Sequence, residues 1–366
     1  MSVNARVQFA QKAMIFRGRH EVLLVERLDD SGGTLRWELP GGRLQEGETL
    51  DEAFSREILE EVGINAISGK PVHVWAFSTD DGESVLALAR DAIQWHGQLS
   101  LRYRDASERL GENRWFQISA LPESIDENSR VAIARSMALI PRGEKEQKFS
   151  ECVLCQVLDE SPDAPIRTSM DQAQLPSEVL CESAFYVAVS DVAPLTPGHL
   201  LIVSREHTKG LFSGPRSHLV DLEGILEYCS ARLQAIYGKR AIAFEHGACV
   251  SDQGCGISHA HLHVLPLEAS LMGLAEDLSG WREYDSLESA SDAVPPGTDY
   301  LLIVEGRVNV RLGSAPSQVL RRRISGFLGT EFWNWSDTVL LGRIPTDSIT
   351  ALHASWKLGH RHGGRE

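Results

Sequence analysis

Three glutamates and an arginine lie within six residues of one another in an acidic stretch. Residues 42 to 64 read GRLQEGETLDEAFSREILEEVGI, in which Arg56 is followed by Glu57, Glu60 and Glu61. On a helix this spacing puts the three carboxylates on one face, where like charges repel by roughly a few tenths of a kcal/mol per pair. A divalent cation would offset that repulsion, and oxygen ligands suit Mg²⁺ or Mn²⁺. The pattern predicts a metal site, and its alternative is an ordinary acidic helix face in solvent.

The neighbouring residues predict the helix independently. Thr49 and Glu52 have the spacing of a capping box, and apolar residues recur every four positions from Phe54. Gly63 can end the helix in a left-handed turn. Residues 37–39 predict a short strand before it, and the Pro-Gly-Gly turn that follows would bring backbone close to the metal.

A second group of reactive side chains is found in the sequence His-Ala-His-Leu-His-Val-Leu-Pro at residues 259–266. Strand alternation places His259, His261 and His263 on one face and apolar residues on the other. A single histidine is more often structural, whereas three at period two are difficult to explain by packing alone. Neutral imidazole can attack phosphorus and form a phosphoramidate, so the central His261 is the expected nucleophile.

A Cys-x-x-Cys pair precedes this region. With six cysteines in 366 residues and no signal peptide, a disulfide framework is not expected, and the pair suggests metal or redox chemistry. His207 and His259 could join Cys152 and Cys155 in a tetrahedral zinc site. The alternative is a pair of reduced thiols without metal, and the rival ligands are Cys249 and Cys255.

Residues 42–64 resemble the Nudix box, and the resemblance extends over about residues 5 to 140. It implies hydrolysis of a nucleoside diphosphate linked to another group, with metal-activated water attacking phosphorus. Arg56 would orient a carboxylate, with Glu48 as the candidate. Glu112 is the candidate for a further acidic ligand, and its alternative is a plain loop glutamate. The metal ligands implied are Glu57, Glu60 and Glu61.

The sequence from Cys152 onward is similar to the histidine-triad (HIT) family of nucleotide hydrolases and transferases. The similarity includes residues 185–191 and 197–203. It implies that His261 takes the nucleotidyl group and that Asp191 accepts hydrogen bonds from ribose hydroxyls. Transferases of the family usually have glutamine at the third triad position, so His263 favours hydrolysis.

Two further segments are predicted to contribute to the second site. Glu245 and His246 occupy a position where better-known HIT members carry an amide near the substrate phosphates, and we expect both to line the pocket. A carboxylate that faces phosphate would be repelled, so Glu245 must be turned away, paired with a cation or assigned to a different substrate group. Ser317 and Gln318 begin a predicted helix that continues with three arginines, residues 321–323. This helix start would form an anion site if it faced the triad, and the alternative is a solvated basic face.

Length and composition predict two or three domains with substantial cores, because 42% of the 366 residues are hydrophobic. A net charge of −15 argues against general nucleic-acid binding. No apolar run reaches membrane length, so a cytoplasmic location is expected. The predicted boundaries are a Nudix domain at 1–140, a linker at 141–150, a HIT domain at 151–268, its extension at 269–352, and a disordered tail at 353–366.

The sequence therefore predicts a bifunctional hydrolase of nucleotide phosphoanhydrides. By resemblance, the first domain is an α/β/α sandwich with a mixed sheet, and the second is an α+β fold with an antiparallel sheet. The expected cofactors are Mg²⁺ or Mn²⁺ in the first domain and structural Zn²⁺ in the second. The expected partners are small nucleotides, and the resemblance suggests a homodimer. The alternatives are a nucleotidyl transferase in small-molecule biosynthesis and a nucleotide-sensing module with one inactive domain.

Overall fold

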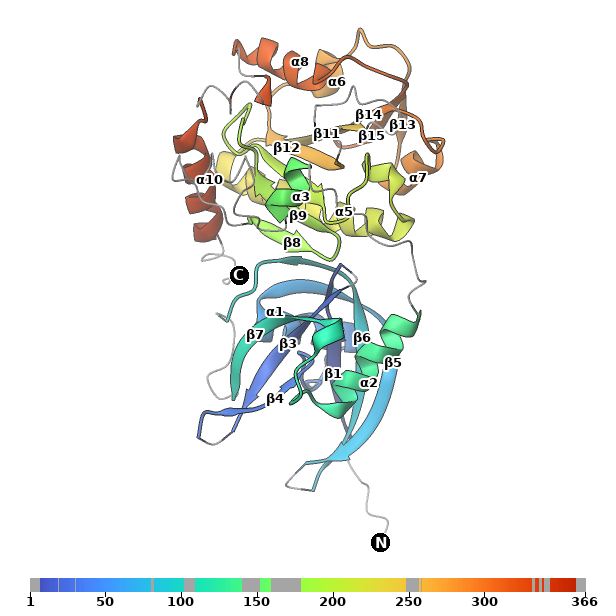
Figure 1. Cartoon of the computed structure of the whole chain (residues 1–366), viewed down its shortest axis with the longest axis vertical. Helices are drawn as coiled ribbons and strands as arrows, with labels where there is room; N and C mark the ends of the chain where they lie inside the picture. The colour runs from blue at the N-terminus through green and yellow to red at the C-terminus, as the bar shows by residue number, and fades with distance from the viewer. Residues whose placement is uncertain are drawn as a thin grey trace. The chain divides into compact units, whose positions relative to one another are not determined.

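The structure is a computed structural model that divides the chain into two compact units, Met1–Lys145 and Glu146–Glu366. It describes residues 7–18, 20–29, 31–79, 82–101, 109–139, 152–158, 179–247, 257, 259–330, 333–335, 338 and 343–359. The predicted linker lies outside the described residues. Figure 1 shows the strands and helices of each unit.

The first unit contains a mixed sheet and a smaller antiparallel sheet. In the mixed sheet β6 pairs with β1 in parallel and with β5 in antiparallel orientation. In the second sheet β3 pairs with β2, β4 and β7. The mixed sheet was expected and the second sheet was not. The strands are β1 (Val7–Met14), β2 (Phe16–Arg17), β3 (Glu21–Leu28), β4 (Thr34–Glu38), β5 (Ile64–Ser78), β6 (Ser84–Gly97) and β7 (Leu110–Gln117).

The helices of this unit are α1 (Leu50–Val62) and α2 (Glu127–Leu139), with a short 3₁₀ turn at Ile118–Ala120. The capping box forms as predicted, with the Thr49 and Glu52 side chains each accepting from the other's backbone N–H. Gly63 ends α1 in the left-handed region at φ 79°. Both ends of the helix that carries the glutamates are therefore specified by local sequence.

The second unit is built on one antiparallel sheet in the order β8-β9-β10-β12-β11-β14-β15-β13. The predicted extension supplies three of these strands, and β14 pairs directly with β11. The strands are β8 (Cys181–Ser183), β9 (Tyr186–Ser190), β10 (Leu200–Ser204), β11 (Ala241–Gly247), β12 (His261–Pro266), β13 (Trp281–Tyr284), β14 (Tyr300–Val304) and β15 (Val308–Leu312).

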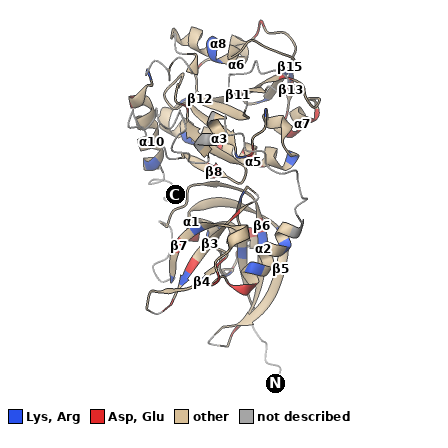
Figure 2. Cartoon of the chain, viewed as in Figure 1, with Lys and Arg blue, Asp and Glu red and all other residues tan. Residues whose placement is uncertain are grey.

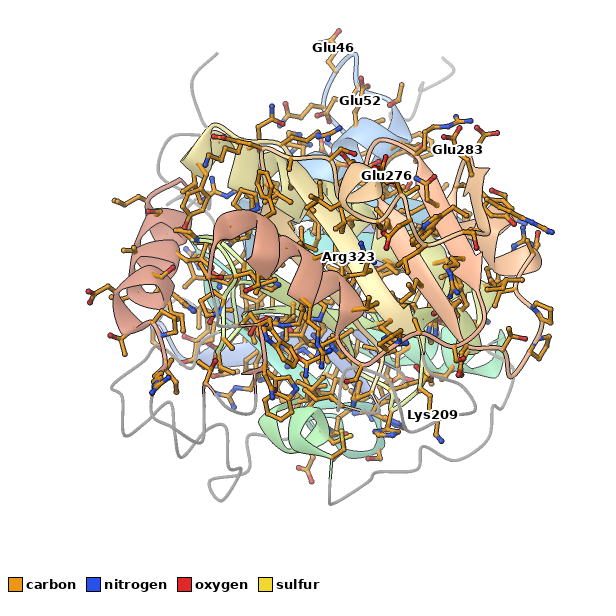
Figure 3. All side chains as sticks on the ribbon, turned by 90° about the horizontal axis from the view of Figure 1, so that it is seen from above. Glu46, Glu52, Lys209, Glu276, Glu283 and Arg323 are labelled. Atoms are coloured by element: carbon orange, nitrogen blue, oxygen red, sulfur yellow. The ribbon has the colours of Figure 1, made fainter. Side chains whose placement is uncertain are left out.

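Helices cover both faces of this sheet. One hydrophobic core joins the sheet to α5 and α10, and another joins the opposite face to α6 and α8. Figure 3 looks onto the second of these faces and labels Arg323 on α8. None of the described helices is long and apolar enough to cross a membrane. The helices are α3 (Val153–Leu158), α5 (Arg216–Tyr237), α6 (Leu271–Leu274), α7 (Leu287–Asp292), α8 (Val319–Leu328) and α10 (Thr346–Gly359), with a 3₁₀ turn at Leu211–Ser213.

Two expectations about this unit need correction. The strand that carries the triad begins at His261, so His259 lies just before it. The tail was expected to be disordered from residue 353, but α10 continues to Gly359. His353 is buried and contacts the Ser190 hydroxyl at 3.2 Å. Packing of Leu352 and Trp356 into the α5 core explains why this segment is ordered.

The loop before α1 lies close against β1. Gln11 N–H donates to the carbonyl of Gly42, and Ala13 N–H donates to that of Pro40. A side chain at Gly41 would place its Cβ 2.3 Å from the Gln11 carbonyl oxygen, and φ at Gly41 is +124°. Only glycine fits this position, because both the space and the backbone conformation exclude a Cβ.

We predict that Gly41→Ala destabilises the protein more than Gly47→Ala. Gly47 also has a positive φ, of +86°, but no atom lies within 4 Å of an added Cβ. The control should therefore lose only the conformational term of about 1–2 kcal/mol. The Gly41 variant should lose at least about 2 kcal/mol more through overlap with β1. Equal losses in chemical denaturation would contradict the close approach.

Candidate active sites

Arg56 organises the carboxylates of the first site. Its guanidinium binds Glu48 through two contacts, at 2.5 and 3.0 Å, as the sequence predicted. It also lies 2.8 Å from Glu57 and 3.0 Å from Glu60. The hydrogen bond from Arg56 lowers the pKa of Glu48 to about 2, so this carboxylate is ionised at neutral pH. One cation thus neutralises Glu48 and two of the three α1 carboxylates that repel one another, Glu57 and Glu60.

The two buried glutamates of α1 face the glycine loop. Glu61 accepts a hydrogen bond from Gly41 N–H at 2.6 Å, and its side chain is buried. A Cβ at Gly42 would lie 2.4 Å from a Glu57 oxygen, so this loop closely surrounds that carboxylate. Glu60 is more open, with a side chain 42% exposed. Oxygen donors of this kind fit Mg²⁺ or Mn²⁺.

Glu112 lies on β7 with an exposed side chain. Its side chain is 67% exposed and pairs with Arg114 at 2.8 Å. Among the described residues, groups of three or more ligand atoms within 4.8 Å occur at two places, and neither includes a glutamate of this unit. The exposed side chain fits a surface glutamate, and Glu112 as a metal ligand stays a prediction, as do Glu57, Glu60 and Glu61.

A buried ion-pair network was missed by the sequence analysis. Acidic and basic positions both occur on β3 and β4 (Figure 2), where Glu38 pairs with Arg27 at 2.7 Å and Arg36 at 3.0 Å. Lys12 bonds both Glu38 at 2.9 Å and the Gly41 carbonyl at 2.6 Å. Burial alone would raise the pKa of Glu38, but Lys12 and Arg27 hold it well below its usual range. The network anchors the glycine loop, and no local sequence signal reveals it.

In the second unit a Cys₂His₂ cluster forms at the predicted residues. The ligand atoms of Cys152, Cys155, His207 and His259 all lie within 4.8 Å of one another. Cys155 Sγ is 3.2 Å from His207 Nδ1 and 3.4 Å from His259 Nδ1. The rival ligands Cys249 and Cys255 lie outside the described residues.

The orientation of His259 suits a metal ligand. Its Nε2 lies 2.7 Å from the Ser204 carbonyl oxygen and must donate to it, which leaves the Nδ1 lone pair facing the two thiols. A backbone acceptor on the far ring nitrogen is typical of metal-bound histidine. Burial lowers the pKa of His259 to about 4, so the ring is neutral, as a ligand must be.

His261 is held in the tautomer that a nucleophile requires. Its Nδ1 lies 2.6 Å from the His259 carbonyl oxygen, which can only accept, so Nδ1 carries the proton. The lone pair is therefore on Nε2. His259 thus links the metal cluster to the nucleophile through its backbone.

A chain of hydrogen bonds fixes the third histidine. Leu195 N–H donates to His199 Nδ1 at 3.1 Å, so the proton of His199 is on Nε2. That nitrogen lies 3.1 Å from His263 Nδ1, and Asp191 Oδ2 lies 3.4 Å from His199 Nε2 and 3.6 Å from His263 Nδ1. His199 was included in the HIT resemblance, but the sequence analysis did not assign it a role. Burial lowers the pKa of His199 to about 4, so its ring is neutral at pH 7.

Both carboxylate oxygens of Asp191 have partners within the protein, and its contact with ribose stays a prediction. Its Oδ1 accepts from Ala193 N–H at 2.8 Å, and its Oδ2 lies 2.7 Å from the Arg321 guanidinium. The residue is only 3% exposed. Burial would raise the pKa of Asp191, but Arg321 and His199 hold it well below its usual range.

Asp191, His199 and His263 also have the composition of a metal site, with ligand atoms within 4.8 Å. The Arg321 guanidinium, however, occupies the Oδ2 atom that a cation would need. We therefore assign this cluster to the positioning of the histidines. Arg321 was expected at an anion site, and its role in neutralising a buried carboxylate is a correction.

The other arginines of α8 are also engaged. Arg322 stacks over the Trp333 ring at 4.0 Å, and Arg323 pairs with Asp277 and with the Leu274 carbonyl. Each of the three arginines of α8 thus has a partner within the protein, and the predicted anion site gains no support from them. Ser317 is half-buried at the start of the helix, and it is not among the residues that line the adjacent pocket.

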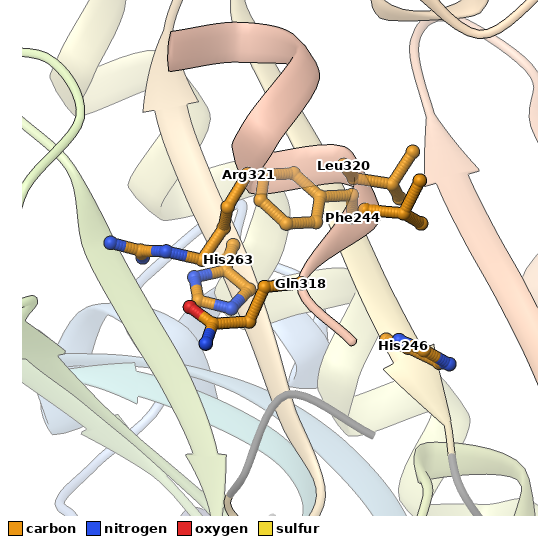
Figure 4. A pocket seen from close by; sticks show the side chains of 7 residues that line it. Phe244, His246, His263, Gln318, Leu320 and Arg321 are labelled. Carbon is orange, nitrogen blue, oxygen red and sulfur yellow. The ribbon is translucent and has the colours of Figure 1, made fainter. Parts of the chain in front are cut away.

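That pocket lies beside the triad, between β11, β12 and the start of α8 (Figure 4). It is lined by Phe244, His246, His263, Gln318, Val319, Leu320 and Arg321. Phe244 stacks on His263 with ring centroids 4.5 Å apart. His246 and Gln318 therefore line a pocket beside the triad, and Glu245 is not among its lining residues.

Glu245 points to the opposite face of β11. It accepts hydrogen bonds from Leu211 N–H at 3.0 Å and from the Tyr300 hydroxyl at 2.5 Å. Strand alternation explains the difference, because its neighbours Phe244 and His246 face the pocket. Burial raises the pKa of Glu245 to about 7.

Comparison with known proteins identifies two domains in the chain. The NUDIX domain model matches residues 8–136, and the HIT domain model matches residues 172–270. The chain is a fusion of a NUDIX domain and a HIT domain, as the two resemblances indicated.

Individual relatives cover parts of the chain. It is 25% identical over 209 residues to the 8-oxo-dGDP phosphatase NUDT18 of Danio rerio, across 57% of this chain and 55% of that protein. It is 40% identical over 62 residues to a putative 8-oxo-dGTP diphosphatase of Bacillus subtilis, across 17% of this chain and 39% of that protein. An uncharacterized HIT-like protein of Mycobacterium tuberculosis is 27% identical over 117 residues, 31% of this chain and 70% of that protein. The chain thus spans about half or less of the length of the first two relatives.

Among solved structures, the MutT NUDIX hydrolase from Burkholderia pseudomallei is 25% identical. It matches with a TM-score of 0.31 and covers 36% of this chain and 98% of that structure.

We predict that Glu245 makes stability fall as pH rises. Its pKa is raised from 4.5 to about 7, so the folded protein binds the proton more tightly than the unfolded chain. Stability is then highest below about pH 4.5, falls between the two values and stays lower above pH 7.

Glu245→Gln should remove this loss and stabilise the protein at pH 8 by up to about 3 kcal/mol. The amide can still accept from Leu211 and can donate to the Tyr300 oxygen. Denaturation at several pH values measures the effect. The control Glu268→Gln, at a side chain 74% exposed, should leave the profile of the wild type unchanged. A profile for Glu245→Gln that matches the control would contradict the prediction.

Proposed function

We propose that the chain is a bifunctional nucleotide phosphoanhydride hydrolase. The NUDIX unit would cleave a nucleoside diphosphate linked to another group, and the HIT unit would cleave a dinucleoside polyphosphate or similar nucleotide through a covalent histidine. The two relatives named for 8-oxo-dGDP and 8-oxo-dGTP suggest oxidised purine deoxynucleotides as the substrate class of the NUDIX unit. A cytoplasmic location stays a prediction from the sequence.

The fixed tautomer of His261 is the observation that carries the HIT proposal. Its Nε2 lone pair can attack phosphorus while Nδ1–H stays bonded to the His259 carbonyl oxygen. A phosphorus–nitrogen bond forms and the bond to the leaving oxygen breaks. In the tautomer protonated on Nε2, His263 would supply a neutral donor for the charge on the phosphoryl oxygens. Water then attacks phosphorus and releases His261.

In the NUDIX unit Glu57, Glu60 and Glu61 would hold the divalent metal. When bound, the metal supplies a water of lowered pKa and neutralises charge on the diphosphate. Arg56 keeps Glu48 ionised and oriented beside these ligands. In the HIT unit Zn²⁺ at the Cys₂His₂ cluster would have a structural role, because a site closed by four protein ligands leaves no position for substrate.

We expect the two activities to be separable by mutation. Glu57→Gln should lower Mg²⁺-dependent hydrolysis of 8-oxo-dGDP by about 100-fold or more, because it removes charge from the metal site. His261→Ala should abolish hydrolysis of diadenosine tetraphosphate without added metal. Each variant should keep the other activity, because the residues lie in different units.

Glu46→Gln is the matched control for the first variant. It removes an exposed carboxylate from the same acidic stretch, and full activity is expected. Alkaline denaturation of the wild type during turnover should yield a nucleotidylated peptide containing His261. Label on another residue would overturn the covalent mechanism.

We also expect one zinc per chain at the Cys₂His₂ cluster. The double variant Cys152→Ser/Cys155→Ser should lose the metal and unfold at a lower temperature, because metal binding contributes folding free energy. The control Cys181→Ser/Cys229→Ser alters two buried thiols outside the cluster and should retain zinc. Zinc-free wild-type protein with full triad activity would refute the site.

A further inference from the structure

Gln318 has an unusual backbone conformation at the start of α8. Its φ is 55° and its ψ is 27°. No other non-glycine residue in the described part of the chain has a positive φ. A residue that precedes a helix normally has an extended backbone and caps the helix with its side chain, and Gln318 does neither. The left-handed region costs roughly 1–2 kcal/mol for a residue with a Cβ, and such strain is often found at functional sites.

The side chain of Gln318 presents a buried acceptor. Its Nε2 donates to Asn334 Oδ1 at 3.3 Å, which orients the amide. Its Oε1 is buried and has no hydrogen-bond partner among the described residues, and the residue is only 8% exposed. Leaving a buried carbonyl oxygen unsatisfied costs about 1–3 kcal/mol, so a donor from a ligand would bind here favourably.

The surroundings place this acceptor in the nucleotide site. Gln318, His246 and His263 line the same pocket (Figure 4), and the His263 and His261 ring centroids are 5.0 Å apart. His246 contributes a second buried nitrogen, Nδ1, that has no partner within the described part of the chain. Gln318 lies outside the part of the chain that matches the HIT model, which ends at residue 270.

We infer that Gln318 Oε1 accepts a hydrogen bond from a ribose hydroxyl of the nucleotide that His261 attacks. This inference rests on the proposed function of the HIT unit. Of the donors on a nucleotide, the sugar hydroxyls are nearest to the phosphorus bonded to the 5′ oxygen, and the base amines are farther away. Asp191 is only 3% exposed and already bonds Ala193 and Arg321, whereas the Gln318 oxygen has no partner among the described residues.

The test compares ribonucleotides with deoxynucleotides. Binding of AMP, 2′-deoxy-AMP and 3′-deoxy-AMP, and of the matching guanosine series, is measured by calorimetry in a Glu57→Gln background without added divalent metal. The chain with native Gln318 should bind the ribonucleotide about tenfold more tightly than the analogue that lacks the contacted hydroxyl. Gln318→Gly should remove this preference, because it should lower the affinity only for nucleotides that carry the contacted hydroxyl.

Glycine is the appropriate replacement because it adopts a positive φ without strain, so the backbone of α8 should be retained. Arg322→Gln is the control: it alters the same helix at a side chain that stacks on Trp333, and the preference should persist. Gln318→Asn tolerates the same φ and is the second variant if the glycine variant unfolds; its shorter amide should also lose the preference.

The outcomes separate this inference from the proposed function. If no covalent His261 intermediate can be trapped in the wild type, the proposed function is wrong. An intact intermediate with equal binding of ribo- and deoxynucleotides would overturn the Gln318 inference alone. The same holds if Gln318→Gly weakens all ligands equally, because the contact would then be to another group.

Discussion

The alternation of side chains along β12 is the constraint on which the second unit depends. Ala260, Leu262 and Val264 pack into the core beneath α5, so His261 and His263 must face the opposite side. That side is covered by α6 and α8, which close a second core over β11 and β14. A slip of one residue would turn the imidazoles toward α5 and the aliphatic side chains toward the face that carries the triad.

The buried pair of Asp191 and Arg321 joins the HIT core to the segment that follows it. Arg321 is 1% exposed and bonds Asp191, the Ala193 carbonyl and the Trp333 carbonyl. Breaking a buried pair of this kind leaves an uncompensated charge and costs about 3–5 kcal/mol. The same carboxylate lies within 3.4 Å of His199, so the position of α8 and the orientation of the histidines are coupled.

In the first unit, Arg56 and Lys12 pair with carboxylates as Arg321 pairs with Asp191 in the second unit. Three contacts from Arg56 gather Glu48, Glu57 and Glu60, while Gly41 N–H holds Glu61. The loop that supplies this N–H is tied in turn to β1 and to the Lys12 and Glu38 pair. The acidic face is thus stabilised by contacts from several elements distant in sequence.

The sequence by itself determined the features that depend on local periodicity and capping. Thr49, Glu52 and Gly63 specify the ends of α1, and the period-two histidines specify the face of β12. The Cys₂His₂ cluster could also be predicted from the sequence, because few residue types can bind zinc. Tertiary structure decided the rest: Glu112 pairs with Arg114, Glu245 points to Tyr300, and Arg321 reaches Asp191. These outcomes depend on which strand or helix lies opposite, and the pairing of β11 with β14 or the packing of α8 leaves no periodic signal in the chain.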